Sequence, residues 1–174
     1  KTQILSSSIK TYHKIKKIIA AEGYSEVVTW SFMDGNKAKL LFDNLISLQN
    51  PISSDLNTMR PSTIPNLLEG INQNKARMYT RAKIFEVGPN FSKSLSDFQE
   101  NVASAITYGS IDEENWLSNK KNTNVYNLKA DLFSVLTILN VPIDNLLYDK
   151  NEDNIYHPGK SATLRLGKNI IAKF

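Results

Sequence analysis

The chain has 174 residues, a net charge of +4 at pH 7 and ordinary proportions of hydrophobic (41%) and charged (22%) residues, which is typical of one globular domain with room for two subregions. It contains no cysteine, so disulfides, thiolate metal sites and thiol catalysis are excluded, and its two histidines, His13 and His157, are too few for a histidine-rich metal site. No apolar run approaches the roughly 20 residues of a membrane span, and no signal peptide is visible, so we expect a cytoplasmic protein.

The first predicted element is a helix that follows the serine run at residues 6–8, where the hydroxyls are N-cap candidates. Gly23 tolerates a left-handed backbone and is expected to end the helix. Lysines and His13 fill much of the polar surface, which is typical of a solvated helix face; contact of residues 10–17 with nucleic acid is the alternative. Apolar residues recur three or four positions apart and form one stripe: Leu5, Ile9, Tyr12, Ile15 and Ile19.

Residues 26–32 are predicted to form a strand, with Val28, Trp30 and Phe32 on one face and their neighbours on the other. A short helix is expected within residues 34–44 and a short strand at residues 45–48. The following segment, up to residue 61, contains two prolines that discourage regular structure. Ser62 or Thr63 then caps a helix, in whose first turn a proline is tolerated.

The second half of the chain is predicted to contain several strands and one helix. Strands are expected at residues 82–87 and 90–92, with a break at Gly88-Pro89, and at residues 102–108. Asn127 is expected to cap a helix over residues 128–139. A short strand at residues 146–148 and a hairpin of residues 161–166 and 169–174 around Gly167-Lys168 follow.

Strands joined by short connections predict an α+β fold, in which an antiparallel sheet is flanked by helices. The chain stops within a strand at Phe174, which indicates a fragment of a larger protein.

Few segments carry residues typical of a catalytic site. There is no glycine-rich phosphate loop and no GxSxG elbow. Acidic residues gather in polar loops, where a solvated surface is favoured over acid–base catalysis: Asp112, Glu113, Glu114, Asp149, Glu152 and Asp153.

Two single residues remain open to interpretation. Arg60, in a proline-containing loop, has the planar fork that suits bidentate binding of phosphate or carboxylate. The alternative is a structural pair with a buried acid, loop carbonyls or a partner subunit. His157 lies in the turn-rich run YHPGKSA, where either a structural or a binding role is open.

Five segments, taken in order, resemble the catalytic-like core module of the bacterial phenylalanyl-tRNA synthetase beta subunit, and the resemblance spans nearly the whole chain: GYSEVVTWSFM, NPISSDLNTMRPSTIPNLLEGINQNKAR, AKIFEVGPNF, YNLKADLFSVL and YHPGKSATLRLG. It implies a class II aminoacyl-tRNA synthetase-like fold in a degenerate copy of the catalytic domain. In the family, the alpha subunit uses ATP and magnesium to charge tRNA(Phe) with phenylalanine, within an alpha2-beta2 heterotetramer. No cofactor, no metal and no membrane contact is expected for this domain itself.

One motif bears on the degeneracy. In catalytic class II domains, a second motif reads roughly Phe-Glu-Ile-Gly-Arg-x-Phe-Arg-x-Glu, and its later arginine holds the ATP phosphate and the substrate carboxylate. Here the matching run is FEVGPNFSKS, which places Ser92 at the clamp position and Ser94 at the closing acid. Lys93 is adjacent, but it points to the other face of a strand and is a point charge, not a fork. We therefore expect no catalytic residue in this domain.

The resemblance also suggests where the domain meets its partner. The first helix and first strand match the family's interface motif, so the contact with the alpha subunit is expected to be formed or supported by large apolar residues: Tyr12, Ile15, Ile19, Val28 and Trp30. Arg60, Glu86 and His157 are assigned to a structural or residual pocket, in which a carboxylate or backbone carbonyls hold Arg60. Two alternatives stay open: a small ATP-dependent ligase that acts through those three residues, and a tRNA-binding module.

Overall fold

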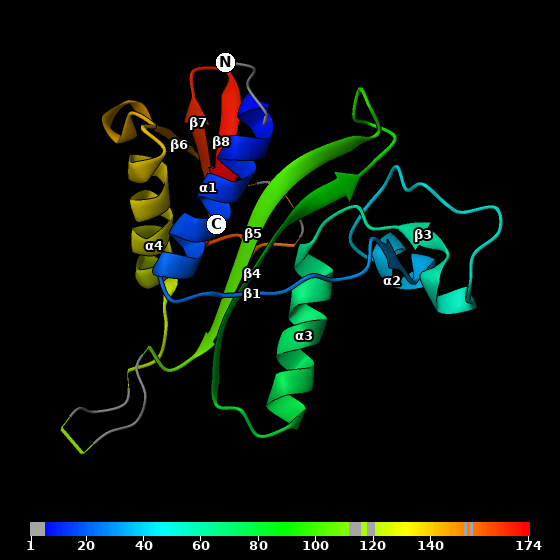
Figure 1. Ribbon diagram of the computed structural model, residues 1–174, viewed down its shortest axis with the longest axis horizontal. Helices are drawn as coiled ribbons and strands as arrows, with labels where there is room; N and C mark the ends of the chain where they lie inside the picture. Colours follow the sequence, from blue (N-terminus) through cyan, green and yellow to red (C-terminus); the bar gives the residue numbers. More distant parts are fainter. Residues whose placement is uncertain (1–5, 112–115, 118–120, 152, 154) are drawn as a thin grey trace. The chain divides into compact units, whose positions relative to one another are not determined.

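The computed structural model describes residues 6–111, 116–117, 121–151, 153 and 155–174 (Figure 1). The chain divides into two compact units, Lys1–Tyr108 and Gly109–Phe174, and each is described by itself. None of the described helices is long and apolar enough to cross a membrane. Five residues used in the sequence predictions lie outside the described part of the chain: Leu5, Asp112, Glu113, Glu114 and Glu152.

The first unit begins with helix α1 (Ser7–Ala21), as the apolar stripe predicts. The Ser6 hydroxyl caps it by accepting a hydrogen bond from the Ile9 amide at 3.4 Å. Gly23 follows the helix with a φ of +84°, a conformation that a residue without a Cβ adopts at little cost. Both ends of this helix are therefore predictable from the sequence.

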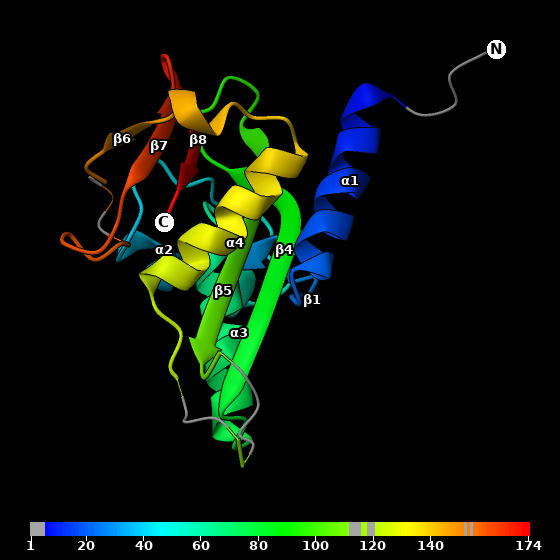
Figure 2. The same ribbon diagram turned by 90° about the vertical axis from the view of Figure 1, so that its left-hand side faces the viewer.

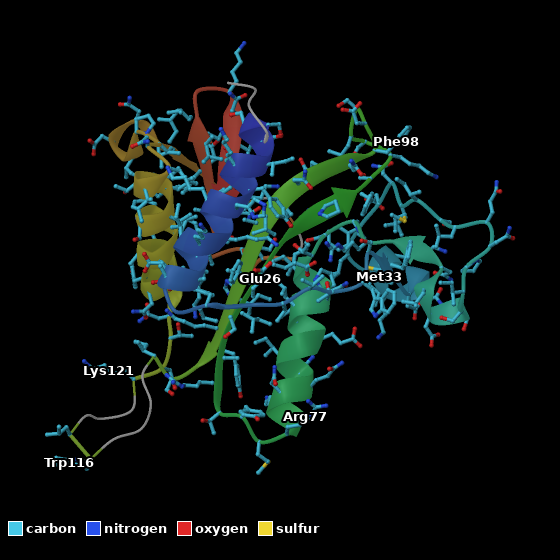
Figure 3. All side chains as sticks on the ribbon, in the orientation of Figure 1. Glu26, Met33, Arg77, Phe98, Trp116 and Lys121 are labelled. Carbon is cyan, nitrogen blue, oxygen red and sulfur yellow. The ribbon has the colours of Figure 1, made fainter. Side chains whose placement is uncertain are left out.

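The main sheet of this unit has the strand order β1 (Ser25–Glu26), β4 (Arg81–Phe91), β5 (Gln99–Gly109). β4 and β5 form a long hairpin whose arrows point in opposite directions, with Phe98 at the connecting turn (Figures 1 and 3). β1 pairs in parallel with β4 over two residues, which is the exception in an otherwise antiparallel structure.

Helix α3 (Ile64–Ala76) runs alongside β4 in both views (Figures 1 and 2). Its Leu67 and Ile71 bury themselves against Ile84 of β4. Burial of such aliphatic side chains is the main source of stability at this contact. Partly buried hydrophobic residues surround the cluster: Val27, Ala82, Ile106 and Tyr108.

The predicted strand at residues 26–32 is wrong in its middle. Strand pairing exists only at its ends, in β1 and in β2 (Phe32–Met33), which pairs antiparallel with β3 (Thr58–Met59). Residues 27–31 between them form no ladder and are held by single backbone bonds to Phe85 and Arg60 and by the Asn66 side chain. Short elements surround this region: α2 (Gly35–Lys39), within the predicted helix at residues 34–44, and the 3-10 turn η1 (Ser54–Leu56). The predicted strand at residues 45–48 is reduced to one bridge, Ser47 to Thr58.

The predicted break at Gly88-Pro89 is also wrong, because β4 continues through both residues to Phe91. Proline has no amide hydrogen to donate to a neighbouring strand. Here the group beside Pro89 is the Arg60 guanidinium, whose Nε donates to the Pro89 carbonyl at 2.9 Å.

The second unit packs helix α4 (Val125–Ile138) with the antiparallel sheet β6 (Leu147–Asp149), β7 (Thr163–Leu166) and β8 (Asn169–Lys173). The predicted hairpin turns at Gly167, where φ is +61°. The predicted cap Asn127 is wrong by three residues: Asn124 caps α4, and Asn127 closes a capping box with it. The 3-10 turn η2 (Ile143–Asn145) precedes β6. Leu136, Leu146 and Leu164 form the core of this unit.

Candidate functional site

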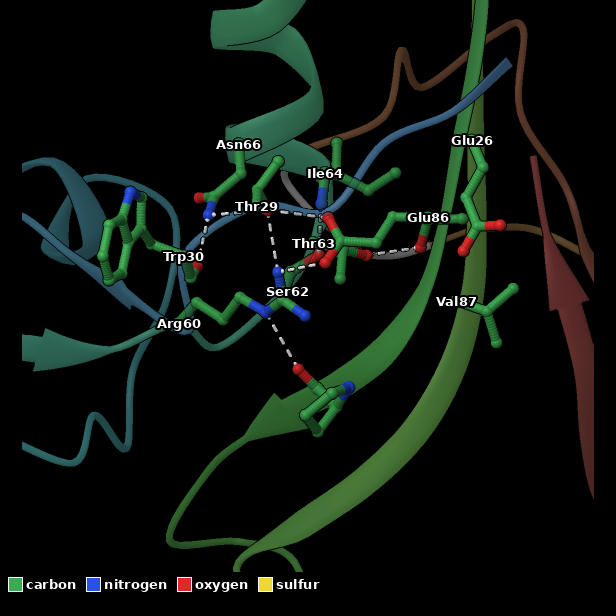
Figure 4. A network of polar contacts seen from close by, with 12 residues as sticks. Glu26, Thr29, Trp30, Arg60, Ser62, Thr63, Ile64, Asn66, Glu86 and Val87 are labelled. Atoms are coloured by element: carbon green, nitrogen blue, oxygen red, sulfur yellow. Dashed lines mark hydrogen bonds and ion pairs between the residues drawn. The ribbon is translucent and has the colours of Figure 1, made fainter. Parts of the chain in front are cut away.

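The most buried charges of the described residues form an ion pair in the first unit. The Arg60 and Glu86 side chains are only 1% and 4% exposed, and Arg60 Nη1 lies 2.7 Å from Glu86 Oε1 (Figure 4). Two charges so deeply buried lose most of their hydration, and the pair is tolerable only when further hydrogen bonds satisfy its remaining atoms. The surroundings of the pair supply those bonds.

Thr29 joins the pair to its surroundings. Its hydroxyl donates to Glu86 Oε2 at 2.7 Å and accepts from Arg60 Nη1 at 2.8 Å and from Asn66 Nδ2 at 3.1 Å (Figure 4). A hydroxyl has one donor and two acceptor positions, so Thr29 is saturated. Both carboxylate oxygens of Glu86 also have partners within the unit. We call Thr29, Arg60, Asn66 and Glu86 the Arg60 network.

Segments far apart in the sequence bring the Arg60 network together. The backbone of Arg60 is held on both sides, because its amide donates to the Ser31 carbonyl and its carbonyl accepts from the Phe91 amide, each at 2.9 Å. Gly88 makes room for the guanidinium: a Cβ at this position would lie 2.6 Å from Arg60 Nη2. Asn66 reaches the network from the first turn of α3.

The geometry fits a closed structural site better than a substrate site. The guanidinium fork could clamp a phosphate or carboxylate, but Glu86, Thr29 and the Pro89 carbonyl already engage it. Over the described ranges, no group of three or more His, Asp or Glu side chains could hold a metal ion. Glu86 and the Pro89 carbonyl therefore hold Arg60 within the first unit.

The structure unites two of the three residues assigned to a residual pocket. His157 belongs to the second unit, where its Nδ1 accepts from the Gly159 amide at 3.0 Å and its carbonyl accepts from the Ser161 hydroxyl at 2.8 Å. These bonds give His157 a role in its own turn.

Ser92 and Ser94, which replace the expected clamp and acid, lie where β4 enters its hairpin turn. Their hydroxyls are 2.8 Å apart, and the Ser92 hydroxyl also accepts from the Ser94 amide at 3.3 Å. The Ser92 amide donates to the Phe98 carbonyl across the turn. Neutral hydroxyls in this arrangement close a turn, and they supply no positive charge to a phosphate.

The five residues predicted for the interface are placed unequally. Ile19 is buried inside the first unit, while Tyr12 and Ile15 are half-buried. Tyr12 is tied to β4, because its hydroxyl donates to the Val87 carbonyl at 2.7 Å. Val28 and Trp30 are 84% and 68% exposed. The first three residues can therefore support a contact, and the last two are free to make one.

Sequence reasoning missed Thr29, Asn66 and Gly88 as parts of the site. Only Thr29 had a signal, since the alternation along residues 26–32 places it on the face opposite Trp30. Asn66 is an ordinary polar residue in a helix pattern. The need for a glycine at Gly88 exists only because Arg60, 28 positions earlier in the sequence, lies against it.

The family model and the curated relatives agree on one family for this chain. The model of the family described as the phenylalanyl tRNA synthetase beta chain CLM domain matches residues 1–174. A phenylalanine--tRNA ligase beta subunit from Rhodospirillum rubrum is 35% identical over 162 residues, which cover 92% of this chain and 20% of that protein. The corresponding subunit from Rickettsia bellii is 38% identical over 169 residues, covering 95% and 19%. The chain thus spans about a fifth of the length of these curated relatives.

Solved structures show the same fold at low sequence identity. Two structures of pyrrolysyl-tRNA synthetase from Desulfitobacterium hafniense superpose with TM-scores of 0.62 and 0.64, at 16% and 15% identity. Each alignment covers 96% of this chain and a little over half of the other, 57% and 58%. At this identity the likeness shows the fold alone, which is the class II aminoacyl-tRNA synthetase-like fold expected from the sequence.

Proposed function

Because the chain belongs to the phenylalanyl-tRNA synthetase beta chain CLM domain family, we propose that it is a non-catalytic structural core domain of a phenylalanine--tRNA ligase beta subunit. In this proposal the domain contacts the alpha subunit, and the alpha subunit charges tRNA(Phe) with phenylalanine. The whole enzyme, an alpha2-beta2 heterotetramer in the cytoplasm, uses ATP and magnesium. The domain itself holds neither.

The closure of the Arg60 network carries this proposal. Adenylate formation needs a cation aimed at the phosphate and at the developing charge. In this site Arg60 is buried against Glu86, and freeing it for a substrate would leave an unpaired carboxylate in the interior. The replacement of the clamp by Ser92 removes the other cation that the family pattern would supply.

The exposed apolar pair Val28 and Trp30 supports a contact with another protein. Val28 and Trp30 are 84% and 68% exposed, so covering them with a partner would remove apolar surface from water and favour binding. Tryptophan is also enriched among residues that dominate binding energy. Tyr12, Ile15 and Ile19 lie on the helix that precedes this segment, where they are buried or half-buried and Tyr12 is bonded to β4.

The proposal is tested by binding of the purified chain to the alpha subunit of the same enzyme. We expect Trp30→Ala to weaken binding by about 30-fold or more, as for other dominant interface residues. Met78→Ser is the matched control, because Met78 is as exposed as Val28, at 85%, but lies just past the C-terminal end of α3. Equal weakening by both substitutions would contradict the assignment of the interface.

Two alternatives have direct assays. A small ATP-dependent ligase acting at Arg60, Glu86 and His157 would catalyse pyrophosphate exchange without the alpha subunit, and Arg60→Ala would abolish it. A tRNA-binding module acting through residues 10–17 would show affinity that falls steeply with salt. Lys16 within that run is already paired with Glu26, which leaves less free charge for a phosphate backbone.

A further inference from the structure

The segment that carries the exposed apolar pair, residues 27–31, is called here the display segment. Its side chains alternate: Val28 and Trp30 face solvent, while Val27, Thr29 and Ser31 face the unit. It lies between β1 and β2 and belongs to neither strand. An extended, exposed segment of this kind ordinarily samples many backbone conformations.

Three contacts along its backbone oppose that freedom. The Val27 amide donates to the Phe85 carbonyl at 2.8 Å, and the Ser31 carbonyl accepts from the Arg60 amide at 2.9 Å. Between these two points the Trp30 carbonyl accepts from Asn66 Nδ2 at 2.8 Å. The display segment is thus fixed at both ends and at Trp30, one of its two exposed apolar residues.

The Arg60 network joins these contacts into one unit. The same Nδ2 of Asn66 that holds the Trp30 carbonyl also donates to the Thr29 hydroxyl. The Arg60–Glu86 pair fixes that hydroxyl in turn. Figure 4 shows the Asn66 side chain in contact with both Thr29 and Trp30 of the display segment, with the Trp30 indole directed away from the ion pair. Three successive hydrogen bonds therefore connect the buried ion pair to the backbone of the exposed Trp30: ion pair to Thr29, Thr29 to Asn66, and Asn66 to the Trp30 carbonyl.

We propose that Arg60, Glu86, Thr29 and Asn66 are positioning residues, which hold the display segment in its binding conformation before the partner arrives. A segment ordered in advance loses little conformational freedom on association, so more of the contact energy appears as affinity. The identity of the partner, the alpha subunit, rests on the proposed function. In this way the buried ion pair contributes to binding at the protein surface by ordering the display segment.

Asn66 offers the cleanest test. It is neutral and only partly buried, so Asn66→Ala removes both hydrogen bonds without leaving a buried charge. Asn72→Ala is the matched control, because Asn72 lies on the exposed face of the same helix.

The first measurement is the NMR order parameter of the Trp30 backbone amide in the chain alone. It should stay near the ~0.85 of rigid backbone in the unaltered chain and in Asn72→Ala, and fall below about 0.6 in Asn66→Ala. An order parameter that does not change in Asn66→Ala would overturn the proposal, whatever happens to binding.

The second measurement is the affinity of the same variants for the alpha subunit, with Trp30→Ala in parallel. Asn66→Ala should bind about tenfold more weakly and Asn72→Ala as tightly as the unaltered chain. If Trp30→Ala weakens binding and Asn66→Ala does not, the positioning role is overturned. If Trp30→Ala also has no effect, the proposed interface fails, and the order parameter alone decides the positioning role.

Discussion

Each unit of the chain contains an arginine–carboxylate pair, and the two pairs differ in how deeply they are buried. In the first unit, Arg60 and Glu86 are 1% and 4% exposed and are bound within a network of hydrogen bonds. In the second, Arg165 Nε lies 2.6 Å from Asp149 Oδ2, but the side chains are 39% and 49% exposed and the contact lacks the geometry of a hydrogen bond. The same two chemical groups therefore form a buried network in the first unit and a partly exposed contact in the second, whose core is formed by leucines.

Removing the arginine from each pair should give the largest difference. Arg60→Met leaves Glu86 as an unpaired buried carboxylate, so we expect a loss of about 3–5 kcal/mol in the free energy of unfolding. Arg165→Met breaks an exposed pair and should cost at most about 1 kcal/mol. Urea unfolding of both variants measures these values. Equal losses would mean that burial does not distinguish the pairs.

Replacing both partners should reverse most of the first loss. In the double variant Arg60→Met, Glu86→Leu no charge is left unpaired, and apolar replacements of buried ion pairs are often neutral or stabilising. We expect its unfolding free energy to lie within about 2 kcal/mol of the unaltered chain. The same variant should still release the display segment, because Thr29 loses two partners. A double variant as unstable as Arg60→Met would show that the cost of the single change is not the unpaired carboxylate.

Two glycines of the first unit should respond with opposite signs. In Gly88→Ala the new Cβ would lie 2.6 Å from Arg60 Nη2 and 3.3 Å from Glu86 Oε1, and such overpacking costs about 1–3 kcal/mol. In Gly70→Ala the nearest atom is Ile84 Cδ1 at 3.7 Å, and alanine inside a helix is favoured over glycine by roughly 0.5–1 kcal/mol. Thermal unfolding should therefore place the two variants on opposite sides of the unaltered chain. A stabilised Gly88→Ala would argue against a tightly packed Arg60 network.

The smallest effect is expected at the surface pair of Lys16 and Glu26. The hydrogen bond to Glu26 raises the pKa of Lys16 above its ordinary 10.5, so its contribution is complete below pH 10.5 and is lost as the pH rises through the higher pKa of the folded state. We expect Lys16→Gln to cost at most about 1 kcal/mol, because the pair is partly exposed. Urea unfolding should give the same cost at pH 7 and pH 9. A cost that disappears by pH 9 would contradict the direction of the shift.

Regular elements of this fold follow from local patterns in the sequence. The stripe of α1, its end at Gly23 and the hairpin at Gly167 depend on residues close together in the chain. The errors occur where distant residues decide the structure. β4 continues through Pro89, whose carbonyl accepts from Arg60, 29 positions away in the sequence. Residues 27–31 form no ladder and are held by bonds to Phe85, Arg60 and Asn66.

The candidate site shows the same limit. The sequence pattern singled out Arg60. The prediction that a carboxylate or carbonyls hold it follows from the general cost of burying a charge. The resemblance placed Glu86 in the same pocket as Arg60, but no local pattern indicated Glu86 as that carboxylate, or Thr29 and Asn66 as the link to Trp30. Those pairings join residues 26 to 57 positions apart, so they follow only from the folded topology.

The central claim is that this site is closed by its own residues and does no chemistry alone. Titration calorimetry of the isolated chain with ATP and phenylalanine together tests it most directly. The account predicts no heat of binding at millimolar ligand and no adenylate in the recovered sample. Millimolar or tighter binding with adenylate formation, in the absence of the alpha subunit, would contradict it.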